Sequence, residues 1–176
     1  MTRLEAHFRD LLQRHGRLRI LTGDYLGITD PDALTRLLDL EGDRELRVFE
    51  TQLPPTPEWP GPSRAVSFHP KSYLFRSADG AGVAFVGSSN LTESALVSGI
   101  EWNYRVVSSQ DGTPFAEIVT AFENLFTHHA TRPLDQAWVD KYRARRPDPR
   151  SAGNPIVALR ESCSIRLLNT RSMRST

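Results

Sequence analysis

A proline-rich segment, LPPTPEWPGP at residues 53–62, constrains the fold more than any other part of this sequence. Proline has no backbone N–H, so this segment cannot pair in the middle of a sheet and is expected to form a surface loop. The loop separates two regions with different patterns. The region before it predicts a strand, a helix and a strand, and the region after it begins with two strands joined by a tight turn.

The first region has the pattern of a unit that builds parallel or mixed sheets. Residues 3–14 carry apolar side chains at helical spacing and predict an amphipathic helix. Residues 18–26 and 45–50 have strand character. Between these strands, Pro31 suits the first turn of a leucine-rich helix, with Thr29 or Asp30 as its N-cap.

The second region predicts more strands and helices. The sequence indicates a strand at 66–75, a hairpin turn at Asp79-Gly80, a strand at 83–86, a short helix from about Asn90, a strand at 100–107, a helix at 114–128 and a helical segment at 134–142. We therefore expect the α/β class, with a mixed, mostly β sheet flanked by helices on both faces. A chain of 176 residues has room for one such domain, which we place at residues 1–142.

The end of the chain has a different composition from residue 143 onward. It is rich in arginine: Arg143, Arg145, Arg146, Arg150, Arg160, Arg166, Arg171 and Arg174. We interpret residues 143–176 as a disordered tail, or alternatively as a segment that contacts a polyanion. A further hypothesis is that this is the truncated or frame-altered end of a longer protein, whose missing part is a helicase or a DNA-recognition domain.

Two features narrow the class of protein. No apolar stretch approaches the roughly 20 residues of a membrane span, and no signal peptide begins the chain, so we expect a cytoplasmic protein without membrane partners. Cys163 is the only cysteine, which excludes an intramolecular disulfide and a cysteine-based zinc site.

The run FHPKSYLF at 68–75 places His69 and Lys71 two residues apart. On a strand such side chains share a face, so we expect the two to project together. Lysine is rare here, because Lys71 and Lys141 are the only lysines among 22 basic residues. A lysine offers a compact point charge to a phosphate, where arginine offers a planar fork.

Two later segments supply further polar groups. Gly87-Ser88-Ser89-Asn90 stands where a strand turns into a helix, whose N-terminal amides can bind an anion. Asn90 is a suitable N-cap, with Glu93 completing a capping box. Glu101 on the next strand is a candidate to orient the His69 imidazole. Each residue alone has an ordinary explanation, as a strand histidine, a solvated charge, a well-capped helix or an edge carboxylate.

Taken together, the order His-x-Lys, then Gly-Ser-x-Asn, then Glu-x-Asn resembles the phospholipase D superfamily. More narrowly, GSSNLTESALVSGIEWNYRVV is similar to the bacterial nuclease branch and to the phospholipase-D-like domains joined to helicases and restriction enzymes. The resemblance covers residues 17–130 and is strongest at 68–107. It implies the phospholipase-D-like fold and a phosphodiesterase that acts as a nuclease, with DNA favoured over RNA.

The resemblance also implies roles for the site residues. His69 is the expected nucleophile, which forms a phosphohistidine. Lys71 and Asn90 are expected to hold the nonbridging oxygens, with Ser88 supporting the phosphate, and Glu101 is expected to orient His69. Neither a metal nor a cofactor is expected, because these donors take the electrostatic role of a metal ion.

Two departures from the family pattern matter. Arg76 stands where the motif often has an aspartate, and the nearby Asp79 lies in the predicted turn. The chain also has one copy of the motif, whereas the mechanism uses two histidines, so we expect a homodimer. The alternatives are a nucleic-acid-binding or regulatory module that has lost turnover and, less favoured, a lipid phosphodiesterase.

Overall fold

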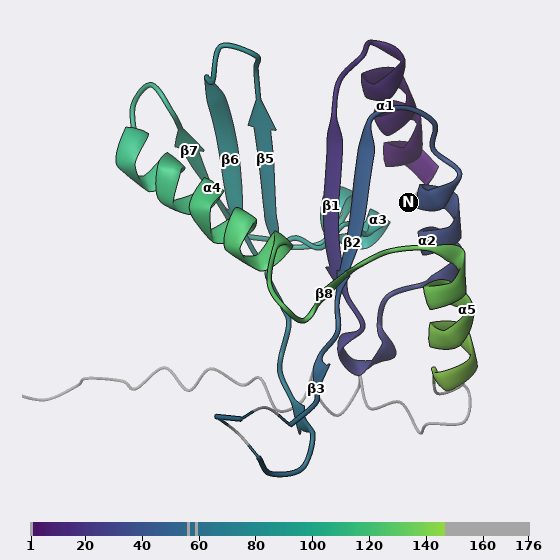
Figure 1. Cartoon of the computed structure of the whole chain (residues 1–176). Coiled ribbons are helices and arrows are strands. Elements are labelled where there is room, and N and C mark those ends of the chain that lie inside the picture. Colours follow the sequence, from purple (N-terminus) through teal and green to yellow (C-terminus); the bar gives the residue numbers. More distant parts are fainter. Residues whose placement is uncertain (1, 56, 59, 147–176) are drawn as a thin grey trace, which may run out of the picture. The chain divides into compact units, whose positions relative to one another are not determined.

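The computed structural model describes residues 2–55, 57–58 and 60–146 of the chain (Figure 1). The chain divides into two units, Met1–Ala144 and Arg145–Thr176. Most of the predicted arginine-rich tail, and Cys163 with it, lies outside the described residues. The fold described below is that of the first unit.

The region before the proline-rich segment forms the predicted strand-helix-strand unit. Strands β1 (Leu18–Gly23) and β2 (Arg44–Phe49) are parallel neighbours, with Ile20 opposite Leu46. Helix α2 (Pro31–Leu38) joins them, and the Asp30 carboxylate accepts from the Asp32 N–H at 3.1 Å. The predicted N-cap and the first-turn Pro31 are thus confirmed.

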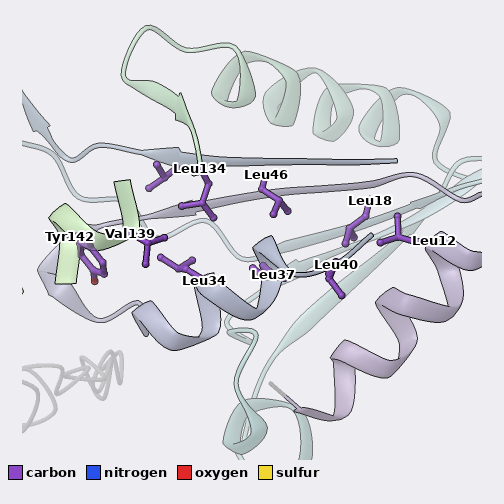
Figure 2. Close-up of a cluster of buried hydrophobic side chains, with 10 residues drawn as sticks. Leu12, Leu18, Leu34, Leu37, Leu40, Leu46, Leu134, Val139 and Tyr142 are labelled. Atoms are coloured by element: carbon purple, nitrogen blue, oxygen red, sulfur yellow. The ribbon is translucent and has the colours of Figure 1, made fainter. Parts of the chain in front are cut away.

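One face of the β1–β2 pair is covered by α1 (Thr2–Gln13), α2 and α5 (Gln136–Arg145), which enclose an apolar core. Leu18 and Ile20 of β1 and Leu46 and Val48 of β2 point into this core, because side chains alternate along a strand. Helix α5 continues three residues beyond the predicted end at 142. The buried cluster consists of Leu12, Leu18, Leu34, Leu37, Leu40, Leu46, Val48, Leu134, Val139 and Tyr142 (Figure 2).

Helix α4 (Gly112–Phe126) lies against the opposite face of the same strands. The Arg19 guanidinium of β1 donates to both carboxylate oxygens of Glu123, at 2.6 and 2.9 Å. Arg47 of β2 donates to the Phe126 carbonyl at 3.0 Å. This sheet therefore has helices on both faces, as predicted.

The region after the proline-rich segment forms an antiparallel meander of β5 (Ser72–Arg76), β6 (Gly82–Gly87) and β7 (Asn103–Val107) (Figure 1). The predicted hairpin turn is confirmed: Gly80 has a φ of +86°, and the Asp79 carboxylate accepts from the Ala81 N–H at 3.0 Å. Helix α4 packs its apolar side on this meander. The buried cluster there is Ala84, Val106 and Phe115, with Leu74, Ile118 and Val119 packed against it.

The strands do not form the single mixed sheet that the sequence predicted. Among the described residues they form three sheets, β1-β2-β8, β3-β4 and β5-β6-β7, where β8 is Thr131–Pro133. Strands β3 (Gln52–Leu53) and β4 (Arg64–Ala65) close the base of the proline-rich segment, whose described residues after Leu53 form no helix or strand, as predicted. The α/β class is confirmed. None of the described helices has the length and apolar composition needed to cross a membrane.

Three predicted strands are shorter than expected. The strand predicted at 66–75 begins only at Ser72, because Pro70 has no N–H to donate and Phe68 packs on the other sheet. The strand predicted at 100–107 begins at Asn103. The strand predicted at 18–26 ends at Gly23 and is followed by the 3-10 turn η1 (Tyr25–Gly27).

Removing the Glu123 charge should lower stability near neutral pH. The hydrogen bond to Arg19 holds the pKa of Glu123 below its ordinary value of 4.5, against the raising effect of burial. The ion pair therefore contributes stability above that pH, and the contribution is lost as the pH falls through the depressed pKa. We expect Glu123→Gln to lower the free energy of unfolding at pH 7 by about 1 kcal/mol, because the pair is partly exposed.

Urea unfolding at pH 7 and at acidic pH measures this difference. The exposed Glu117 on the same helix offers the control, since Glu117→Gln removes one charge from α4 but not the contact with Arg19. Equal losses of stability in the two variants would contradict a specific ion pair.

Candidate functional site

The segment that carries His69 is anchored to the first sheet by Phe68. The Phe68 ring stacks on Phe49 of β2, with ring centroids 4.8 Å apart and planes at 17°. It also lies against Gly23 at the end of β1, where a Cβ atom would come within 2.5 Å of the ring. Phe68 thus packs against Gly23 and Phe49. The next residue, His69, is therefore held at the carboxyl ends of β1 and β2.

The same segment is anchored to the second sheet by Lys71. The Gly87 N–H donates to the Lys71 carbonyl at 3.1 Å, which extends the β5–β6 pairing by one step beyond Ser72 and Val86. His69 is therefore fixed on both sides, by Phe68 before it and by Lys71 after it. Its position depends on both sheets.

The His69 and Lys71 side chains lie together, as predicted, although neither residue belongs to a strand. Lys71 Nζ is 3.1 Å from His69 Nδ1 and 3.2 Å from the His69 carbonyl oxygen. A charged ammonium can only donate, so Nδ1 is the unprotonated ring nitrogen in this contact. Burial, and secondly the Lys71 charge, lower the pKa of His69 below its ordinary value of 6.5. The imidazole is therefore neutral near pH 7.

The turn at Gly87-Ser88-Ser89-Asn90 is locked by backbone and side-chain hydrogen bonds. The Ser88 N–H donates to the Trp102 carbonyl at 2.9 Å, and a Cβ on Gly87 would come within 2.0 Å of that oxygen. The Ser89 hydroxyl, which is buried, accepts from the Asn103 amide at 2.6 Å. Asn90 remains exposed, as does Ser88. Only glycine fits at position 87.

The predicted N-cap role of Asn90 is wrong. Helix α3 (Glu93–Val97) begins three residues later, and the Thr92 hydroxyl accepts from the Ala95 N–H at 3.3 Å in the capping position. The Glu93 side chain, and with it the predicted capping box, lies outside the described side chains. A five-residue helix that starts beyond Asn90 gives no helix terminus for an anion, so the donors available here are side chains.

Glu101 lies beside Ser88 rather than beside His69. Within the described residues, the Glu101 carboxylate accepts from the Ser88 hydroxyl, which in turn accepts from the Trp102 N–H at 3.0 Å, and no hydrogen bond joins Glu101 to His69. The expected orienting contact is therefore absent. The pairing of Gly87 with Asn103 explains this, because it brings the residues just before β7 alongside Ser88.

The Glu101 carboxylate affects Tyr73, a residue of the β5–β6–β7 meander. Burial, and secondly the Glu101 carboxylate, raise the pKa of Tyr73 above its ordinary value of 10.0. The Tyr73 hydroxyl donates to the Ser89 carbonyl at 2.9 Å. The site is thus divided into a cationic side, with Lys71 next to His69, and an anionic side, with Glu101 next to Ser88.

One neighbour of His69 was not predicted from the sequence. The ring of Tyr25, in the turn after β1, lies 4.7 Å from the His69 ring, with the planes at 79°. The only sequence signal for this contact was an aromatic residue at the end of a parallel strand, where functional side chains often gather. The two residues are 44 positions apart, so no local pattern links them.

Comparison of the chain with models of known protein families finds no match, and comparison with curated proteins finds none either. Within the described residues, no three His, Cys, Asp or Glu side chains form a group that could hold a metal ion. The resemblance to the phospholipase D superfamily therefore rests on the site residues themselves.

Removing the Lys71 charge should raise the pKa of His69. We expect Lys71→Met to move this pKa part of the way toward 6.5, because burial, the larger cause of the depression, remains. An NMR pH titration of the His69 ring protons, assigned with His69→Gln, measures the change. The other lysine gives the control: Lys141→Met, in α5, should leave the pKa unchanged. An unchanged pKa in Lys71→Met would show that the two groups do not interact.

Proposed function

We propose that this chain is a metal-independent phosphodiesterase of the phospholipase D type that cleaves nucleic acid. The observation that supports this best is the contact between the Lys71 ammonium and the unprotonated Nδ1 of His69, at 3.1 Å. The Lys71 carbonyl also accepts from the N–H of Gly87, which begins the turn that carries the exposed Ser88 and Asn90. A cation in contact with a neutral nucleophilic nitrogen, with further polar side chains in the adjoining turn, suits an anionic phosphodiester.

The first step is attack by His69 on phosphorus. In the free protein the Nδ1 lone pair accepts from the Lys71 ammonium, so a bound phosphate must first draw the ammonium onto its own oxygens before this lone pair can attack phosphorus. The P–N bond forms as the bond to the leaving oxygen breaks, and an acid protonates that oxygen. Lys71 and Asn90 stabilise charge on the nonbridging oxygens.

The second step is hydrolysis of the phosphohistidine. Water attacks phosphorus, the P–N bond breaks, and the conjugate base of the acid takes the water proton. His69 is thereby released as a neutral imidazole. In the free protein the single Ser88 hydroxyl proton is donated to Glu101, so Ser88 supports the phosphate in both steps by turning this proton from Glu101 to a phosphate oxygen.

The acid is proposed to be His69 of a second copy. In the part of the chain that the structure describes, the His69 ring contacts Tyr25 and Lys71, and no other histidine touches it. An exposed apolar surface lies next to the site. This α3–β7 surface consists of Leu96, Val97, Ile100, Trp102 and Tyr104, whose exposures run from 44% to 95%. Such a patch is typical of a protein interface.

The position of this surface supports a homodimer that completes the site. Glu101 stands between Ile100, which is 95% exposed, and Trp102, which is 84% exposed. A two-fold interface through these side chains would bring the two copies together beside Glu101 and Ser88. The aliphatic residues of this surface favour contact with a protein over stacking on nucleic-acid bases. Nucleic acid would then bind on the cationic side of the site, near Lys71.

His69→Ala should abolish cleavage, with a loss on the order of 10³-fold or more, because the nucleophile is removed. We expect the wild-type protein to keep its activity on short DNA in the presence of chelator, and intact-mass measurement after rapid quenching to find a phosphate adduct on His69. The control is His7→Ala, which changes an exposed histidine of α1. Full activity in His69→Ala, without an adduct in the wild type, would refute the proposal.

Ile100→Asp should dissociate the dimer. A carboxylate buried without a partner at the interface costs several kcal/mol, so we expect the dimer Kd to rise by about 100-fold or more. Sedimentation over a range of protein concentrations measures the mass. Leu11→Asp, at an exposed position of α1, is the matched control. A wild-type protein that is monomeric at the concentrations where it is active would contradict the two-histidine mechanism.

A binding module without turnover is the second candidate. Two observations favour it: Arg76 occupies the position of the motif aspartate, at the far end of β5, and Glu101 contacts Ser88 instead of His69. A dimer that binds nucleic acid but leaves it intact would select this candidate. In either case DNA, a homodimer and a separate helicase or DNA-recognition domain remain the proposed partners.

A further inference from the structure

The turn that follows β1 reaches the His69 segment from the first sheet. Tyr25, the first residue of η1, packs its ring against His69 at 4.7 Å, nearly perpendicular to it. The Ser67 hydroxyl donates to the Tyr25 hydroxyl oxygen at 3.1 Å. Tyr25 therefore contacts the residues on both sides of Phe68, the side chain that docks the segment.

The backbone before Tyr25 is held by a buried partner. The Asp24 carboxylate accepts from both the N–H and the hydroxyl of Thr51, each at 2.7 Å. Thr51 is only 4% exposed, so these charge-assisted hydrogen bonds are shielded from water. After the turn, the Thr29 hydroxyl donates to the Gly23 carbonyl at 2.7 Å. Both ends of the turn are thus fixed to the ends of β1 and β2.

The backbone after Tyr25 adopts a conformation that most side chains avoid. Leu26 has φ +53° and ψ +13°, in the left-handed region, and Gly27 follows with φ +65°. For leucine this costs about 1–2 kcal/mol. Burial of the Leu26 side chain does not offset this conformational cost, because the side chain is 55% exposed. The two left-handed residues reverse the chain directly after Tyr25, and the surrounding hydrogen bonds maintain this geometry.

We propose that Tyr25 is a positioning residue for His69: it holds the imidazole ring in the orientation in which Nδ1 meets Lys71. The catalytic consequence rests on the proposed function, but the contact itself does not. A perpendicular ring pair restricts rotation of the imidazole, and the Ser67 hydrogen bond in turn restricts the phenol. This takes the place of the Glu101 contact that the sequence had suggested.

The charged and titratable groups around His69 make the proposal measurable. Lys71 faces the ring from the position just before β5, and Tyr25 faces it from η1, while Glu101 is hydrogen-bonded to Ser88. Burial is the larger cause of the depressed His69 pKa. His69 is an exposed residue whose imidazole Tyr25 covers on one side, so removing the Tyr25 ring opens that side to water and the pKa should rise.

The experiment is NMR of the full chain with three variants. In Tyr25→Leu we expect the His69 ring-proton shifts to move, because the ring current is lost, and the pKa of His69 to rise toward 6.5. Tyr25→Phe and Ser67→Ala, which keep the aromatic ring, should resemble each other and change the pKa much less. In the wild type, nuclear Overhauser contacts should join the Tyr25 and His69 ring protons.

Unchanged His69 shifts and pKa in Tyr25→Leu would overturn the proposal, as would the absence of wild-type Overhauser contacts if that variant fails to fold. Cleavage assays then test the catalytic consequence. We expect Tyr25→Leu to lower kcat by roughly 10- to 100-fold with a smaller effect on KM, and to shift the pH–rate profile with the His69 pKa. A protein with the NMR coupling but no cleavage activity in the wild type would refute the proposed function and leave the positioning contact intact.

Discussion

The stacking of Phe68 on Phe49 is the contact on which the candidate site depends. It joins the strand-helix-strand region before the proline-rich loop to the meander after it, at the point where Gly23 leaves room for the ring. Fully burying a phenylalanine side chain stabilises a fold by about 1.5–3 kcal/mol. The partly buried Phe68 contributes a part of this, which offsets the entropy of ordering about one residue of the segment. Because Ser67 and His69 flank Phe68, the stacking of Phe68 on Phe49 also places both of these residues in contact with Tyr25.

The residues around His69 have different proposed chemical roles and come from different segments. The cation and the nucleophile come from the segment that Phe68 anchors, and the neutral donors come from the turn after β6. The Glu101 carboxylate is kept away from the imidazole by its hydrogen bond to Ser88. A neutral His69 near pH 7 suits a nucleophile and leaves the acid to be supplied by another group, which is why a second copy is central to the proposed mechanism.

Local features of the fold could be predicted from the sequence, and contacts between distant segments could not. Asp30 and Pro31 indicate the start of α2, and Asp79-Gly80 indicates the hairpin, because caps and turns depend on neighbouring residues. The prediction of a strand at 66–75 is wrong for the residues before Ser72, because the sequence pattern does not show that Phe68 packs on the other sheet. The contact of His69 with Lys71 was predicted, but from a strand to which neither residue belongs, whereas the partners of Glu101 and Tyr25 depend on how three sheets assemble.

The most direct test of a shared phosphodiester site is a crystal structure of the protein with orthovanadate, which mimics the five-coordinate phosphorus of the reaction. We expect vanadium bonded to His69 of one copy, with vanadate oxygens contacted by Lys71 and Asn90 and with His69 of a second copy on the opposite side. Vanadate bound away from His69, or coordinated within a single isolated copy, would contradict the two-histidine site.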